Sequence, residues 1–175
     1  MLRLALPLFV AFAFAQTVPP EQMRINAPYV TTPNIVVDAM LKLANVKRSD
    51  VVYDLGCGDG RIVIAAAKKL GAHGVDIDIN PERIAEARTN AQSANVAHLL
   101  RFEINDVFDS DIHDATVVVL YLLQDLNLRL RPKLLHDLKP GTRVISHAFH
   151  MGSWKPEREM IVEGNRLYLW TIPAP

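Results

Sequence analysis

The residues best suited to chemistry in this chain lie in one acidic, glycine-spaced turn. Its members are Asp54, Gly56, Gly58, Asp59 and Gly60, directly after the strand-forming run Val51-Val52-Tyr53 and before an Ala/Ile-rich segment. Glycines at alternate positions permit positive φ and remove the Cβ atoms that would keep a ligand from the backbone. The first amides of a following helix would point into the same gap. The pattern therefore predicts a site for a nucleotide-like cofactor.

The two acids decide which cofactor this turn suits. A dinucleotide site follows the pattern G-x-G-x-x-G and leaves its amides free for a pyrophosphate. Here the third glycine is wrongly spaced, and the carboxylates of Asp54 and Asp59 would repel a diphosphate. S-adenosylmethionine fits better, because it carries an ammonium and a sulfonium. A nicotinamide-dependent oxidoreductase is the least favoured hypothesis.

The charge and the cysteine content of the chain limit the kinds of partner and site that it can have. The chain has 175 residues and a formal net charge of zero, which argues against a nucleic-acid partner held by a basic face. Arg129, Arg131 and Lys133 form a small basic group that we interpret as a solvated helix face. Cys57 is the only cysteine, so no disulfide framework or zinc knuckle is expected, and we interpret it as a spacer in the turn.

A further acid follows the turn by about 20 residues, where an acid can accept hydrogen bonds from both ribose hydroxyls. Asp78 ends the predicted strand 72–77 and precedes Pro81, while Asp76 is a competitor on the same strand face. We favour Asp78, because only a residue at the end of the strand projects over the ligand crevice. A role in capping the next helix is less favoured, since Asn80 can already do this.

The first 15 residues have the composition of a secretory leader. Arg3 is followed by the apolar stretch 4–13 and by the small-x-small sequence 13–15 before Gln16. We expect residues 1–15 to be a signal peptide, 16–28 a linker, and 29–175 a single domain, with the protein exported. The alternative is an uncut leader that tethers the domain to a membrane on the cytosolic side, where S-adenosylmethionine is made.

The rest of the chain alternates strand and helix signals. Strands are predicted at 51–55, 72–77, 100–104, 116–122 and 143–148, with a hairpin of 160–163 and 167–170 across Gly164-Asn165. A first helix is predicted to begin with a Thr32 cap and Pro33 at its first turn, and to bury Ile35 with other apolar residues. This order predicts an α/β fold, a Rossmann-like doubly wound sheet that is mostly parallel with a C-terminal antiparallel hairpin.

The run 51–61 resembles motif I of class I (seven-strand) S-adenosylmethionine-dependent methyltransferases, because the acids, the glycines and the flanking strand and helix agree together. The resemblance implies that Asp106 and Val107, after the third strand, bind the adenine. They would complete a cofactor pocket with Asp54, Gly56 and Asp78.

A closer resemblance covers the segments 26–33, 36–41 and 53–63, which are similar to the small relatives of the mitochondrial ATP synthase c-subunit lysine methyltransferase. It implies a protein-lysine N-methyltransferase, whose partner is a protein with an accessible lysine. It also implies that the Tyr29 segment folds over the cofactor and helps to form the lysine channel. Without the resemblance, the same segment is equally a hydrophobic staple with a Thr32 cap.

The catalytic residues are harder to find, because methyl transfer needs mainly an aligned, unprotonated nucleophile and the exclusion of water. The segment 120–127, after the fourth strand, is the usual place for substrate contacts, and it supplies Tyr121 and Asn127 as candidates beside Tyr29. It lacks the Asn/Asp-Pro-Pro-Tyr/Phe signature that is typical of methylation of planar amines. Small-molecule methylation and a non-catalytic cofactor-binding protein are the alternative functions.

His147 and His150 stand three residues apart at the end of the fifth predicted strand. Two histidines without further ligands are more often hydrogen-bonded structural groups than a metal site, so no metal is expected. A weaker hypothesis makes His147 a proton acceptor near the crevice.

Overall fold

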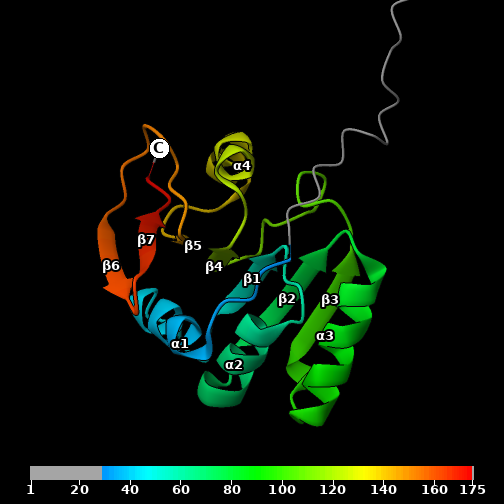
Figure 1. The fold of residues 1–175 in the computed structure, drawn as a ribbon. Helices are drawn as coiled ribbons and strands as arrows, with labels where there is room; N and C mark the ends of the chain where they lie inside the picture. Colours follow the sequence, from blue (N-terminus) through cyan, green and yellow to red (C-terminus); the bar gives the residue numbers. More distant parts are fainter. Residues whose placement is uncertain (1–28, 175) are drawn as a thin grey trace, which may run out of the picture.

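A computed structural model describes residues 29–174; the predicted leader and linker lie outside the described residues. One seven-stranded sheet organises this part of the chain, in the order β3-β2-β1-β4-β5-β7-β6 (Figure 1). The strands are β1 (Val51–Leu55), β2 (His73–Asp78), β3 (Leu100–Ile104), β4 (Val117–Leu120), β5 (Arg143–His147), β6 (Arg158–Val162) and β7 (Asn165–Thr171). The first five run parallel, and β7 is antiparallel to both of its neighbours.

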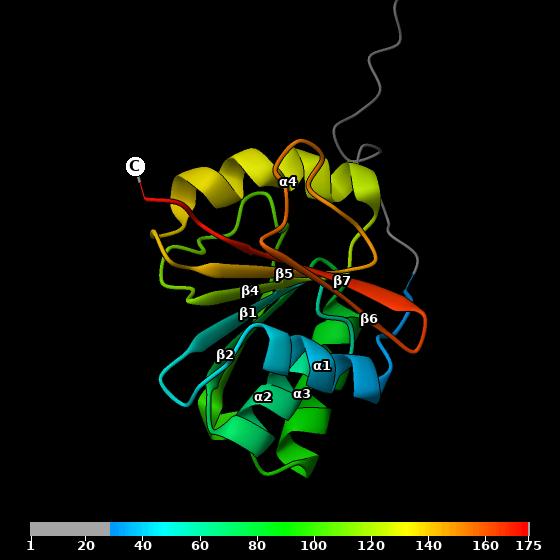
Figure 2. The same ribbon diagram turned by 90° about the vertical axis from the view of Figure 1, so that its left-hand side faces the viewer.

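Helices cover both faces of this sheet. They are α1 (Asn34–Leu43), α2 (Arg61–Leu70), α3 (Pro81–Ser93) and α4 (Gln124–Asp137), with a 3₁₀ turn, η2 (Ala97–Leu99), before β3. Figure 2 shows α1, α2 and α3 on one face and α4 on the other. Every residue of β4 is buried, as expected for a central strand with both faces covered. The predicted doubly wound, mostly parallel fold is therefore confirmed.

Two apolar layers hold the helices to the sheet. Met40 of α1 and Val63 of α2 pack with Ile145 on one face. On the other face, Leu130 and Leu134 of α4 pack with residues that include Trp170. Burial of such side chains, at about 25 cal/mol per Å² of apolar surface, is the main force that keeps the carboxyl ends of the strands aligned.

The predicted hairpin is formed by β6 and β7, with a shifted turn. Glu163 and Gly164 occupy the turn, with φ of 50° and 77°, and Asn165 already belongs to β7. Two residues with positive φ give a turn whose twist matches the flanking strands.

The start of α1 differs from the prediction. Pro33 is the N-cap residue, and no side chain caps the helix. The Thr32 hydroxyl instead meets Nδ1 of His147 at 3.2 Å, 115 residues later in the sequence. Ile35, predicted on the buried face, is 54% exposed. The cap prediction was wrong because a distant partner, invisible to local pattern, engages the hydroxyl.

No helix within residues 29–174 combines the length and the apolar content needed to cross a membrane.

Candidate functional site

The carboxyl ends of β1 to β4 open onto a pocket of about 340 Å³. Nine of the eleven predicted site residues line it: Tyr29, Asp54, Gly56, Gly58, Asp59, Asp78, Asp106, Val107 and Tyr121. The crevice at the ends of parallel strands is where ligands bind in open α/β sheets. Gly60 and Asn127, the other two, do not line the pocket.

The glycine turn shapes the floor of the pocket. Gly58 has a φ of 57°, and a Cβ there would lie 2.5 Å from Cε2 of Tyr29. Gly60 is the N-cap of α2, with a φ of 77°, and a Cβ there would meet the buried carboxylate of Asp76 at 2.6 Å. The absence of a side chain at Gly58 therefore leaves room for the ring of Tyr29 at the pocket. At Gly60 it leaves room for buried residues that do not line the pocket.

Asp78 and Asp76 have opposite surroundings. The carboxylate of Asp78 lines the pocket and accepts hydrogen bonds from the backbone amides of Gly58 at 3.0 Å and Asn80 at 2.9 Å. Asp76 is fully buried, and neither of its oxygens has a hydrogen-bond partner among the described residues. Its burial, together with the charges of Asp54 and Asp59, raises its pKa well above the usual range. Asp78 is thus the acid that a ligand can reach. Asn80 also caps α3, as expected, through the amide of Glu82.

The two acids of the turn also differ. Asp59 is ion-paired with Arg61 at 2.5 Å, and although burial opposes ionisation, the hydrogen bonds and charge of Arg61 outweigh it and lower the pKa of Asp59. Asp54 has no such cation among the described residues. Burial, followed by the charges of Asp78 and Asp59, raises the pKa of Asp54 to about 8. A ligand ammonium placed here would neutralise a carboxylate that the protein leaves uncompensated.

The β3 end of the pocket is lined by Asn105, Asp106, Val107 and Phe108. Asp106 accepts from the amide of Phe108 at 3.0 Å, which turns the chain and brings Val107 and Phe108 to the pocket wall. The guanidinium of Arg129, from α4, lies 4.4 Å from the centre of the Phe108 ring. Arg129 is exposed on α4, as a solvated helix face predicts, and it also lines the pocket, which was not expected. Its position depends on how α4 crosses the sheet, which local sequence does not reveal.

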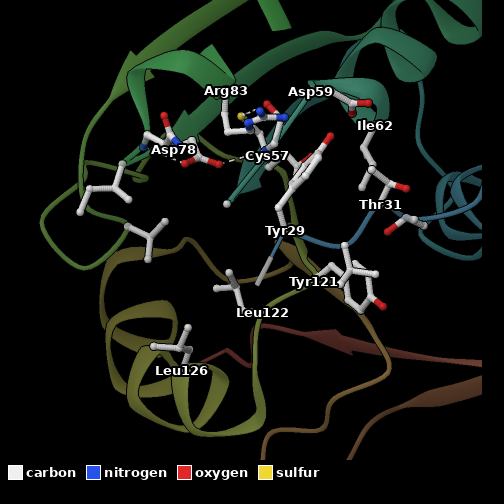
Figure 3. Close-up of a pocket in the computed structure, with 18 of the residues that line it drawn as sticks. Tyr29, Thr31, Cys57, Asp59, Ile62, Asp78, Arg83, Tyr121, Leu122 and Leu126 are labelled. Carbon is white, nitrogen blue, oxygen red and sulfur yellow. Dashed lines mark hydrogen bonds between the residues drawn. The ribbon is translucent and has the colours of Figure 1, made fainter. Parts of the chain in front are cut away.

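Residues 29–33 form an arm beside the glycine turn, and the pocket is lined by its residues Tyr29, Val30, Thr31 and Thr32. The ring of Tyr29 lies next to Gly58 and 4.4 Å from the guanidinium of Arg83 (Figure 3). Arg61 donates a hydrogen bond to the carbonyl oxygen of Thr32 at 2.9 Å. Sequence reasoning missed the contacts of both arginines with the arm, because Arg61 lies 29 residues from Thr32 and Arg83 is still farther from Tyr29 in the sequence.

Tyr121 and Asn127 separate in the structure. Tyr121 follows β4 and lines the pocket, whereas Asn127 lies on the inner face of α4 and is fully buried. The side-chain amide of Asn127 donates to Ser146 Oγ at 3.0 Å and to the carbonyl of Phe149 at 3.2 Å. Asn127 holds the end of β5 and does not reach the pocket, so its assignment as a catalytic candidate does not fit the structure.

The two histidines do not form a metal site. Residues 29–174 contain no group of three or more potential metal ligands. His147 is 1% exposed, with Thr32 and Asn165 at its two ring nitrogens. His150 Nδ1 accepts from the amide of Gly152 at 2.9 Å. Because both nitrogens of His147 are engaged and the ring is buried, the structure contradicts a role for it as a proton acceptor.

Comparison with known proteins shows which family the chain resembles. Residues 54–158 match the model of the ANTKMT methyltransferase domain. A protein-lysine N-methyltransferase of Saccharolobus islandicus (strain REY15A) is 45% identical over 84% of this chain and 94% of its own length. The lysine N-methyltransferase of the ATP synthase c-subunit from Xenopus laevis is 33% identical over 80% of this chain, which spans 61% of that longer protein.

A solved structure extends the comparison. The crystal structure of an RNA methyltransferase from Salinibacter ruber, in complex with S-adenosyl-L-homocysteine, is 54% identical, with a TM-score of 0.82 over 83% of this chain and 95% of that one. The residues matched by the family model include the glycine turn and the strands β2, β3 and β4. The chain belongs to the ANTKMT methyltransferase domain family.

Proposed function

We propose that this chain is an S-adenosylmethionine-dependent protein-lysine N-methyltransferase. The observation that carries the proposal is the buried carboxyl group of Asp54, which has no cationic partner among the described residues, in a pocket that also presents Asp78 and Asp106. The relatives support it, since the Saccharolobus protein is a protein-lysine N-methyltransferase and the Salinibacter structure holds S-adenosyl-L-homocysteine.

The strand order supports a proposed position for each part of the cofactor. Along β3, β2, β1 and β4 the pocket presents Asp106, Asp78, Asp54 and Tyr121 in turn. Adenine would lie at Asp106 and Val107, the ribose hydroxyls at Asp78, and the ammonium at Asp54. Both oxygens of Asp78 already accept backbone amides, but each carboxylate oxygen has a second lone pair for a hydroxyl. Bound S-adenosylmethionine supplies a methyl group that its sulfonium has already activated.

The remaining task of the protein is to orient a neutral amine and to exclude water. Tyr121 lines the β4 end of the pocket and Tyr29 lies across the glycine turn, so aromatic surface from two segments would border the acceptor. Desolvation against such surface favours the uncharged form of a lysine amine, and that form is the nucleophile.

An RNA substrate is the main rival, because the Salinibacter protein is called an RNA methyltransferase. The charge of this chain favours a protein instead. The chain has no net positive charge, and two of the three arginines that line the pocket, Arg61 and Arg83, are paired with Asp59 and Glu86, while the third, Arg129, lies over the ring of Phe108. A surface that binds RNA by counterion release needs unpaired cations.

The test supplies tritiated S-adenosylmethionine to the purified protein with two acceptor pools from a strain that lacks the gene: its total protein and its total RNA. We expect label in protein, recovered as methyl-lysine after hydrolysis, and none with Asp54→Asn. Label in RNA would overturn the lysine assignment and keep the enzyme. Methylation of a small-molecule fraction alone would favour the small-molecule alternative. Binding without any S-adenosylhomocysteine formation would indicate a non-catalytic protein.

Export through the leader is part of the same proposal, supported by Arg3, the apolar stretch 4–13 and the small-x-small sequence before Gln16. N-terminal sequencing of protein purified from its native host should find Gln16 first. An intact Met1 in the membrane fraction would support the alternative, a tethered enzyme that faces the cytosol and its cofactor supply.

A further inference from the structure

His147, the last residue of β5, touches three segments that are distant in sequence. Its Nδ1 lies 3.2 Å from the hydroxyl of Thr32 in the arm, and its Nε2 lies 3.0 Å from Oδ1 of Asn165 at the start of β7. Its ring stacks on Tyr121, with ring centres 3.9 Å apart and planes inclined by 27°. The residue is buried and does not line the pocket, whereas Thr32 and Tyr121 do.

The hydrogen bonds of Asn165 fix the protonation of His147. The side-chain nitrogen of Asn165 donates to the carbonyls of Val162 at 3.3 Å and Glu163 at 3.0 Å, so its oxygen faces the histidine. An amide oxygen only accepts, and therefore Nε2 of His147 carries the proton. Burial also lowers the pKa of His147, which keeps the ring neutral. Nδ1 is then the bare nitrogen, and the Thr32 hydroxyl must donate to it.

Thr32 is consequently held from two sides. Its hydroxyl donates a hydrogen bond to His147. Its carbonyl oxygen accepts a hydrogen bond, at 2.9 Å, from Arg61, which directly follows the glycine turn. Figure 3 shows the neighbouring Thr31 and Tyr121 on the side of the pocket away from Asp78. In the strand order, this β4 and β5 side is opposite to β3, where Asp106 lies. His147 thus contacts residues of two walls at the end of the pocket opposite to Asp106.

We propose that His147 is a positioning residue for the methyl acceptor: through Thr32 and Tyr121 it fixes the arm and the aromatic wall at the acceptor end of the pocket. This rests on the proposed function, in which the cofactor occupies the β3 to β1 part of the pocket. It follows that His147 should affect transfer to the acceptor much more than binding of the cofactor.

The test compares Thr32→Val, which keeps the shape and removes the hydroxyl, with Thr32→Ser, which restores it, and with His147→Phe, which keeps a ring for stacking. S-adenosylhomocysteine affinity, measured by calorimetry, should change less than 2-fold. Transfer of tritiated methyl groups to a dilution series of protein extract from a gene-deleted strain should show a loss of about 3- to 10-fold in kcat/KM for Thr32→Val, the range expected for one neutral hydrogen bond. Thr32→Ser should recover most of it.

A double variant separates positioning from simple loss of structure. If the two residues act through one contact, Thr32→Val should add little to the transfer defect of His147→Phe. Amide hydrogen exchange with S-adenosylhomocysteine bound gives a readout that needs no acceptor. Residues 29–33 should exchange faster in Thr32→Val than in wild type and Thr32→Ser, while the β1 amides stay unchanged.

Three results would overturn the proposal: unchanged exchange of the arm in Thr32→Val, equal losses of cofactor affinity and transfer, or no recovery by Thr32→Ser. An inactive wild-type protein with the expected exchange pattern would instead contradict the proposed function, and with it the acceptor role of His147, while still showing that His147 holds the arm through Thr32.

Discussion

The carboxylate of Asp78 accepts a hydrogen bond from the backbone amide of Gly58 at 3.0 Å, so the end of β2 holds the glycine turn that follows β1. One side chain therefore shapes the turn and also presents an acid to the pocket. The two residues are 20 positions apart, and the chain between them includes the whole of α2, which crosses one face of the sheet. This crossover connection brings the carboxyl ends of the parallel strands β1 and β2 together.

Asp78→Ala should weaken S-adenosylmethionine binding by about 10- to 200-fold, the range for loss of charge-assisted hydrogen bonds. Asp76→Asn is the matched control, because that residue lies on the same strand but is fully buried and does not line the pocket. Calorimetric titration measures both. A larger loss in Asp76→Asn than in Asp78→Ala would contradict the assignment of the ribose site.

Asp54 predicts a pH-dependent cofactor affinity. Its pKa of about 8 means that the carboxyl is mostly protonated at neutral pH in the free protein. A bound ammonium favours the ionised form, so binding releases a proton and the affinity should rise from pH 6 towards pH 8, by at most about tenfold per unit. Above roughly pH 8 the cofactor amine itself loses its charge, and the affinity should fall.

Calorimetry at pH 7 in two buffers of different ionisation heat counts the released protons directly. We expect nearly one proton for wild type, and both fewer protons and a flatter rise for Asp54→Asn. A wild-type affinity that is constant between pH 6 and pH 8, with no proton released, would show that Asp54 is already ionised in the free protein.

Local sequence was sufficient for the fold and for most of the pocket. The run 51–61 contains a strand, a turn and the start of a helix. The alternation of strands and helices then predicts that Asp78 and Asp106 lie at the carboxyl ends of β2 and β3. Long-range contacts were not accessible. Thr32 and His147 are 115 residues apart, and nothing near either residue indicates the other.

The prediction that Asn127 is a catalytic residue failed for a different reason. Helix α4 begins at Gln124 with Leu123 as its N-cap residue, and no side chain caps it. Pro132 lies inside the helix, where proline normally argues against a continuous helix. The start of α4 therefore lacks the usual sequence signals, and local pattern does not show that Asn127 lies on a helix and faces the core.

Gly58 offers a test of the arm that is independent of the acids. A Cβ at this position would meet the ring of Tyr29 at 2.5 Å, whereas a Cβ on Gly164, in the hairpin turn, would meet nothing within 4 Å. Both residues have positive φ, so Gly58→Ala and Gly164→Ala should each lose roughly 1–2 kcal/mol of stability through the backbone. Only Gly58→Ala should also displace Tyr29.

We therefore expect S-adenosylhomocysteine affinity to fall by about tenfold in Gly58→Ala, which corresponds to about 1.4 kcal/mol, and to be unchanged in Gly164→Ala. Thermal unfolding and calorimetry on the same samples separate the two effects. Equal affinities in the two variants would mean that the arm does not contribute to the cofactor site.

Asp76 predicts how stability depends on pH. Its oxygens have no hydrogen-bond partner among the described residues, and burial raises its folded-state pKa well above 3.8, the ordinary value. The unfolded chain then loses this proton at lower pH than the folded protein. The contribution of Asp76 to the free energy of unfolding should be greatest below about pH 4. It should decline as the pH rises towards the folded-state pKa. Asp54, whose pKa is also raised, contributes with the same sign.

Asp76→Asn replaces the carboxyl by a neutral group of similar shape and removes its titration. The melting temperature of wild type should therefore fall more between pH 5 and pH 8 than that of Asp76→Asn, whatever constant cost the buried amide adds at every pH. Asp38→Asn is a control, since Asp38 is an exposed surface residue paired with Lys69. If wild type and Asp76→Asn lose the same number of degrees over this range, Asp76 does not carry a proton in the folded protein, and a neutralising partner must lie close to it in solution.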